Sequence, residues 1–213
     1  MRGKRLLRHL VAASIVLGTG AASANELAEL PSEVLYDLVS EVEQSDEDRS
    51  TKLRVLKALA HDERDEVRAR VAEAAAYLWT DTQDEALELL RTLAGDDAPK
   101  VRAAAANGLT RVLYLASPAE RFDLVCNWTV AESGAERMAM ARALSSKVPA
   151  LVADLALEVL SSDPDAEIRS AALRAAAQRF DEDPATYRRI AEERSADSDR
   201  GVRRAARRLL GRA

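Results

Sequence analysis

One short pattern returns every 32 to 35 residues along most of this chain. Each copy has an acidic residue at a turn, then a Val or Ile followed by Arg, and then small residues. The clear copies are Asp62-x4-Val67-Arg68, Asp96-x4-Val101-Arg102, Asp163-x4-Ile168-Arg169 and Asp197-x4-Val202-Arg203, with a degraded copy at Glu136-Arg137. A fixed period in this range is typical of arrays of stacked helical hairpins.

The segments between the turns predict an all-α protein. They are rich in Ala, Leu and Val and show no sustained alternation of apolar and polar residues, and aromatic residues make up only 4% of the chain, so strands are not expected. Ser117 and Asp163, each followed by Pro, are typical helix starts. The predicted helices are 32–44, 51–60, 65–79, 84–94, 99–115, 118–131, 135–147, 149–161, 166–180, 184–194 and 199–211. Pairing them in order leaves 199–211 as a single last helix.

The helix that contains each Val-Arg or Ile-Arg pair has one face of small residues. Counting from Ile168, the apolar and small residues are Ala171, Ala172, Ala175 and Ala176. This spacing places them on one side of a helix. Ala in place of Leu permits the close approach between helices that a stack of hairpins requires.

The N-terminus has the order of a secretory signal peptide. Arg2, Lys4, Arg5 and Arg8 precede an apolar stretch at 10–22, which ends in the small residues Ala22-Ser23-Ala24. The alternative is a membrane anchor, but a spanning helix needs roughly 20 apolar residues. We therefore predict cleavage after Ala24, which gives a periplasmic or secreted protein with no membrane segment after cleavage.

The net charge limits the classes of function that fit this chain, and the cysteine content limits its disulfide chemistry. Cleavage removes four of the 31 basic residues and none of the 36 acidic ones, so the exported form has a formal net charge of −9. This charge argues against nonspecific nucleic-acid binding. The single Cys126 has no partner in the chain, and we expect it to be buried.

The repeated pattern resembles the HEAT-repeat family, in particular its short bacterial form first described in phycobilisome lyases. The resemblance covers residues 62–212 well and 32–61 weakly, and the third copy departs from it with Ala131 in place of Asp and Glu136 in place of Val. Tetratricopeptide repeats have a similar period, but Trp79 and Trp128 do not recur as that family requires. The resemblance implies a right-handed α-solenoid of about five to six hairpins over residues 32–213, after a signal peptide at 1–24 and a tail at 25–31.

The resemblance also implies which charges are structural. HEAT arrays contain a ladder of Asp and Arg between neighbouring repeats, and a planar guanidinium can bind a carboxylate and turn carbonyls together. The matching residues here are Asp62, Arg68, Asp96, Arg102, Arg137, Asp163, Arg169, Asp197 and Arg203.

A second set of positions forms the candidate binding site. Six residues after each Val67-type position lies a residue expected to be exposed, and in HEAT proteins the second helices line the concave surface. These residues are Glu73, Asn107, Arg142, Arg174 and Arg208, joined by the neighbouring Arg204. The row changes from acidic to basic, so it either keeps an Ala-rich surface soluble or forms a groove whose basic end accepts an acidic segment of a protein partner.

No motif for catalysis or for a cofactor or metal is found in the sequence. His61 stands at a predicted helix end, where the helix dipole favours it, and the acidic clusters lack the ligand spacing of a calcium loop. We therefore expect a non-catalytic adaptor or scaffold. The alternatives are an enzyme or enzyme-associated subunit of the lyase type, a nucleic-acid-binding protein, and a structural spacer without a groove partner.

Overall fold

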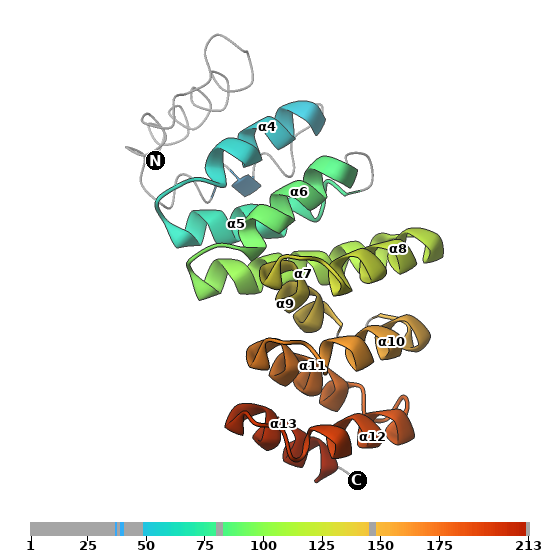
Figure 1. Ribbon diagram of the computed structural model, residues 1–213. Helices are drawn as coiled ribbons and strands as arrows, with labels where there is room; N and C mark the ends of the chain where they lie inside the picture. Colours follow the sequence, from blue (N-terminus) through green and yellow to red (C-terminus); the bar gives the residue numbers. More distant parts are fainter. Residues whose placement is uncertain (1–36, 38, 41–48, 80–82, 145–147, 212–213) are drawn as a thin grey trace. The chain divides into compact units, whose positions relative to one another are not determined.

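The computed structural model describes residues 37, 39–40, 49–79, 83–144 and 148–211 (Figure 1). These residues form helices and no strand, which confirms the all-α prediction. The helices are α4 (Arg49–Leu59), α5 (Asp65–Ala75), α6 (Gln83–Ala94), α7 (Pro99–Leu115), α8 (Pro118–Thr129), α9 (Gly134–Ala143), α10 (Ala150–Leu160), α11 (Ala166–Gln178), α12 (Pro184–Arg194) and α13 (Arg200–Leu210). The predicted signal peptide, the tail at 25–31 and most of the helix at 32–44 lie outside the described residues.

The chain divides into two compact units, residues 1–108 and 109–213, and the division falls within α7. In the first unit α4, α5 and α6 contact one another. The first part of α7 packs closely on this group at Gly108. A Cβ atom built there would lie 2.8 Å from Leu90 Cδ2 and 2.9 Å from the carbonyl oxygen of Ala72. Only glycine fits this approach without movement of its neighbours.

The second unit consists of hairpins in which each member pairs across a short turn. Helix α8 packs on α9, α10 on α11, and α12 on α13 (Figure 1). The second members, α9, α11 and α13, also contact one another in succession. The prediction that 199–211 is a single last helix is therefore wrong, because α13 completes a hairpin with α12.

The core of the second unit is built largely from small residues on these second helices. On α11 the buried residues include Ile168, Ala171, Ala172 and Leu173, and on α13 they are Val202, Ala205, Ala206 and Leu209. Because the alanine side chain is small, it keeps the backbones of adjacent helices close together. The closeness of α11 and α13 follows from this composition.

Several helix boundaries differ from the predicted ones for identifiable reasons. Helix α5 ends at Ala75 instead of residue 79, because Tyr77 and Leu78 donate to the carbonyls three residues earlier and tighten the last turn. Ser117 caps α8 as predicted, in a reciprocal arrangement with Glu120. Asp163 does not cap α11; Asp165 accepts from the N–H of Glu167 and performs that role.

Candidate functional site

A groove of about 660 Å³ lies between α11 and α13. Its lining residues are Ser170, Leu173, Arg174, Ala177, Gln178, Gly201, Arg204, Ala205 and Arg208. Leu173 and Ala205 are buried, whereas Arg174, Arg204 and Arg208 are exposed. The groove therefore has an apolar floor of small residues and cationic side chains from both flanking helices.

Helical spacing explains this arrangement. Arg174 follows Ser170 by four residues on α11, and Arg208 follows Arg204 by four on α13, so each pair lies on one side of its helix. Arg174 donates from Nη1 to the Ser170 hydroxyl at 2.8 Å. This bond fixes the position of one cation beside the groove.

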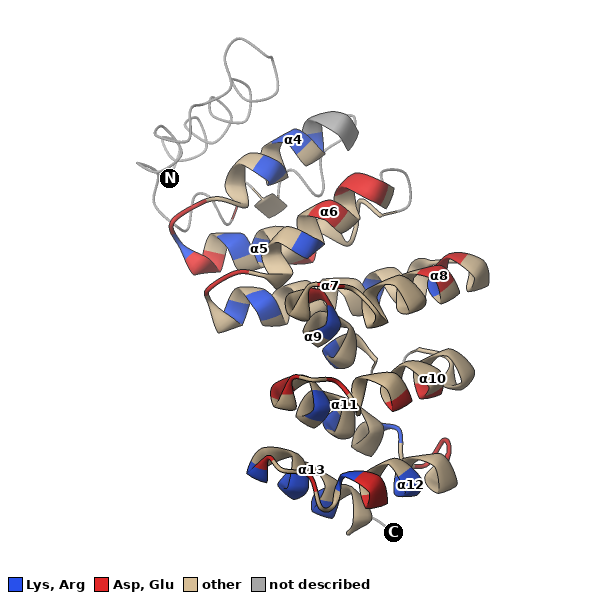
Figure 2. Ribbon diagram, viewed as in Figure 1, with Lys and Arg blue, Asp and Glu red and all other residues tan. Residues whose placement is uncertain are grey.

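The groove is positive even though the chain carries an excess of acidic residues. Basic side chains are concentrated on α13 (Figure 2). Among the described residues, no carboxylate forms an ion pair with Arg174, Arg204 or Arg208. Their charges are available to an anionic group from outside the protein.

The other residues of the predicted row lie elsewhere. Arg142 occupies on α9 the position that Arg174 occupies on α11, and it is exposed but does not line the groove. In the first unit, Glu73 is exposed on α5 and its carboxylate lies 3.1 Å from Arg70 Nη1, and Asn107 is exposed on α7. The structure thus brings Arg174, Arg204 and Arg208 together.

The structure pairs three of the motif arginines with the aspartate of the next copy. Arg169 binds both carboxylate oxygens of Asp197, at 2.9 Å from Nε and 2.8 Å from Nη2, and its Nη1 donates to the carbonyls of Asp163 and Pro164. Arg68 binds Asp96 in the same way, and Arg137 binds Asp163. Each of these arginines therefore joins its own turn to the next one.

The remaining members of the motif have different partners. Asp62 is bound on both oxygens by Arg64, two residues later in its own turn, at 2.7 Å in each case. Arg102 and Arg203 donate from Nη1 to two carbonyls of their own turns. Neither Arg102 nor Arg203 forms an ion pair with a carboxylate among the described residues.

The paired guanidinium groups also lower the pKa of aspartates in the ladder. The two hydrogen bonds from Arg169 are the largest influence on Asp197 and hold its pKa below the ordinary value, with partial burial opposing them and the N–H of Asp199 reinforcing them. Arg68 lowers the pKa of Asp96 in the same way. Burial alone would raise the pKa of Asp62, but the hydrogen bonds from Arg64 outweigh it and lower the pKa.

This lowered pKa predicts a pH dependence of stability. A carboxylate whose pKa is lower in the folded than in the unfolded state stabilises fully above the unfolded value, about 3.9, and this contribution is lost as the pH falls through the folded value. Asp197→Asn should therefore reduce the free energy of unfolding by about 1–2 kcal/mol at pH 7, and the difference from the unaltered protein should shrink below about pH 4. Urea denaturation at a series of pH values measures both effects.

Asp181→Asn is the matched control, because Asp181 is an exposed carboxylate in the turn between α11 and α12. It should leave stability unchanged within about 0.5 kcal/mol. A loss for Asp197→Asn that stays constant down to pH 2 would show that the ion pair does not contribute through its charge.

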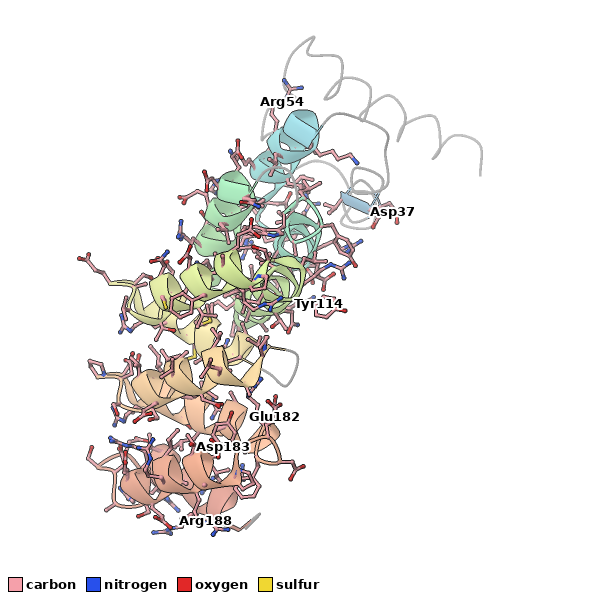
Figure 3. All side chains as sticks on the ribbon, turned by 90° about the vertical axis from the view of Figure 1, so that its right-hand side faces the viewer. Asp37, Arg54, Tyr114, Glu182, Asp183 and Arg188 are labelled. Carbon is pink, nitrogen blue, oxygen red and sulfur yellow. The ribbon has the colours of Figure 1, made fainter. Side chains whose placement is uncertain are left out.

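A charged cluster around a buried arginine in the second unit was not expected from the sequence. Arg179 follows α11 and is 1% exposed. Its Nη2 lies 2.5 Å from the Glu182 carboxylate, and its Nε donates to the Tyr187 hydroxyl at 3.1 Å. The Tyr187 hydroxyl in turn donates to Asp154. The cluster joins α10, the turn after α11, and α12. Figure 3 labels its member Glu182 and the next turn residue, Asp183.

The two residues considered for chemistry are both at the surface. His61 is exposed in the turn after α4. Cys126 is exposed on α8, so the expectation of a buried thiol is wrong. The buried face of α8 is formed by Leu124, Val125, Trp128 and Thr129, and residue 126 is turned away from it. The described residues contain no group of three or more potential metal-binding side chains, and none of the described helices has the length and hydropathy of a membrane-spanning segment.

Comparison with known proteins identifies the repeat. The model of a family described as HEAT repeats matches residues 53–121. A search of curated protein sequences finds no match. Among solved structures, one described as an engineered protein from the Northeast Structural Genomics Consortium is 17% identical, and the alignment covers 94% of this chain and 95% of that one with a TM-score of 0.42. That likeness carries no argument about function.

Proposed function

Since residues 53–121 match the model of HEAT repeats, we propose that this chain is an exported, non-catalytic protein-binding module whose α11–α13 groove holds an acidic segment of a partner. HEAT repeats commonly serve as scaffolds for protein interaction, because stacked helices provide long continuous surfaces. The observation that carries the proposal is the groove of about 660 Å³ with Arg174, Arg204 and Arg208 beside it.

The construction of the groove favours a peptide over a small anion. Its floor is apolar at Leu173, Ala177 and Ala205, and its cations come from two different helices. A peptide with acidic and small apolar side chains would satisfy both features at once. Local positive charge also attracts an acidic segment even when the net charge of the protein is negative.

The proposal of export rests on the N-terminal sequence. The basic residues, the short apolar stretch and the small residues before Asn25 have the order of a signal peptide. The non-catalytic role rests on the absence from the sequence of a recognisable nucleophile, phosphate-binding or metal-binding motif.

The test is a crosslinking pull-down from the envelope fraction of the exporting cell, with the form that begins at Asn25 as bait. The variant Arg174→Glu, Arg204→Glu, Arg208→Glu should lose at least about tenfold of the captured partner, because the three attractive charges beside the groove become repulsive. Quantitative mass spectrometry measures the ratio.

A matched control reverses three exposed cations that lie outside the groove, Lys57, Lys100 and Arg188; Figure 3 labels Arg188 on α12. This control has the same change in net charge and should keep its partner. Equal capture by both variants would reject the groove, and no specific partner for the unaltered protein would favour the spacer or enzyme-associated reading.

A further inference from the structure

Arg203 is a ladder residue whose carboxylate-binding side has no partner among the residues that the structure describes. Its Nη1 donates to the carbonyls of Asp197 and Ser198 at 2.7 and 2.8 Å. Arg169, 34 residues earlier, makes the equivalent two bonds and also binds Asp197 through Nε and Nη2. The guanidinium of Arg203 is therefore held in the orientation that binds a carboxylate, yet no described carboxylate lies against its Nε and Nη2.

Other positions of α13 also carry cations where the equivalent positions of α11 are apolar. Leu173 of α11 is fully buried, and the residue at the same position of α13 is Arg207. Likewise Ala166 corresponds to Arg200. Where α11 uses apolar residues to pack on the next second helix, α13 presents cations. An apolar helix that packed on α13 as α13 packs on α11 would bury these charges without partners, which is strongly unfavourable.

These residues form a second surface, which we call the end face and define as Arg200, Arg203 and Arg207. A hollow of about 380 Å³ lies over it, lined by these three residues together with Arg204 and Arg208. Successive helix residues turn by about 100°, so the end face is centred to one side of Arg204 and the α11–α13 groove lies to the other. No described carboxylate pairs with any of the three.

We propose that the end face is a docking surface for an acidic turn of another protein, in which one Asp is bound bidentately by Nε and Nη2 of Arg203. The charge complementarity is direct, because a guanidinium with two free parallel donors matches one carboxylate. Arg200 and Arg207 would attract further acidic residues of the same turn. This site goes beyond the groove proposed above and does not depend on it.

The first described acidic turn of a second copy of this chain is a poor candidate for the occupant. Its Asp62 would be the equivalent of Asp197, but Arg64 already binds both of its oxygens. Docking on Arg203 would require that pair to break. A carboxylate supplied by a different protein has no such competitor.

The probe for this site is a synthetic peptide that copies residues 161–167, Ser-Ser-Asp-Pro-Asp-Ala-Glu, the turn that presents Asp163 to Arg137. The protein is labelled with 15N-arginine, and the Nε–H signals are followed by NMR during peptide titration. We expect a shift of the Arg203 signal with a Kd on the order of millimolar. A peptide with Asn in place of Asp163 should bind at least about fivefold more weakly, because it lacks the ionised acceptor.

Arg203→Lys is the test variant, because it keeps the charge and removes the two parallel donors. It should weaken peptide binding by about fivefold or more. The matched control is Arg102→Lys, which alters the same pair of turn-carbonyl bonds in the first unit and should leave binding within about twofold. Thermal unfolding of both variants shows whether the fold is intact, and Arg200→Gln with Arg207→Gln gives a second variant that leaves the turn bonds untouched.

Two results would overturn the proposal. One is equal peptide affinity for Arg203→Lys and the unaltered protein, and the other is the absence of any peptide-dependent shift at Arg203. Either would leave the cations of α13 as a surface that only keeps the last described helix soluble. Arg174→Glu separates the two sites, since it should reduce partner capture by the groove and preserve the Arg203 shift.

Discussion

Arg179→Ala should lower the free energy of unfolding of the second unit by about 2–4 kcal/mol, because it removes the hydrogen bonds of a buried guanidinium and leaves a cavity in its place. Arg179 is 1% exposed and bonded to both Glu182 and the Tyr187 hydroxyl. Its loss leaves the Glu182 carboxylate without this cation and removes one neighbour of the Asp154–Tyr187 bond. Chemical denaturation followed by circular dichroism measures the change.

Two further variants identify the cause. Tyr187→Phe removes the hydroxyl between Arg179 and Asp154 and should cost less, about 1–3 kcal/mol. Arg188→Ala changes an exposed arginine on the neighbouring helix and should have an effect within about 0.5 kcal/mol. If Arg179→Ala were no more harmful than Arg188→Ala, the cluster would not hold α10, α11 and α12 together.

Gly108→Ala should destabilise the first unit by about 1–3 kcal/mol through overpacking. Its new Cβ would meet the carbonyl oxygen of Ala72 at 2.9 Å, and this backbone atom cannot move aside as a flexible side chain can. Denaturation of the variant should show a lower midpoint with an unchanged slope.

Gly134→Ala provides the matched control. Gly134 is the first residue of α9, and a Cβ there would meet only Arg137 Nη2, at 3.8 Å. Alanine is favoured over glycine in helices by up to about 1 kcal/mol, so this variant should be neutral or more stable. The opposite signs of the two changes separate close helix contact from helix propensity, and a stabilising Gly108→Ala would reject the contact.

The fold was predictable because the same pattern of turn and helix residues recurs along the sequence. Asp96 and Asp197 stand at the same spacing before the following Arg, and this agreement between copies supports the prediction of a repeat. Helix ends were less predictable, since the end of α5 depends on hydrogen bonds three residues apart at Tyr77 and Leu78. Sequence periodicity carries no information about that local tightening.

The candidate site was only partly visible in the sequence. The regular spacing of Arg174 and Arg208 placed both on one row, and the structure adds that Arg204 joins them beside a groove. The spacing did not separate Arg142 from the other two. Arg179, Tyr187 and Asp154 follow no shared period, so the contact between them depends on tertiary packing and could not be predicted from any single segment.

The direction of the Asp–Arg pairs has a consequence for how such a chain can grow. Each complete copy contributes one cation toward the following copy and one carboxylate toward the preceding one, as the segment from Asp163 to Arg169 does. A duplicated segment of that kind, inserted in phase, would meet a carboxylate on one side and a guanidinium on the other. Duplication or deletion of such segments would therefore lengthen or shorten the protein by whole hairpins while the Asp and Arg at the new junctions kept their counterparts.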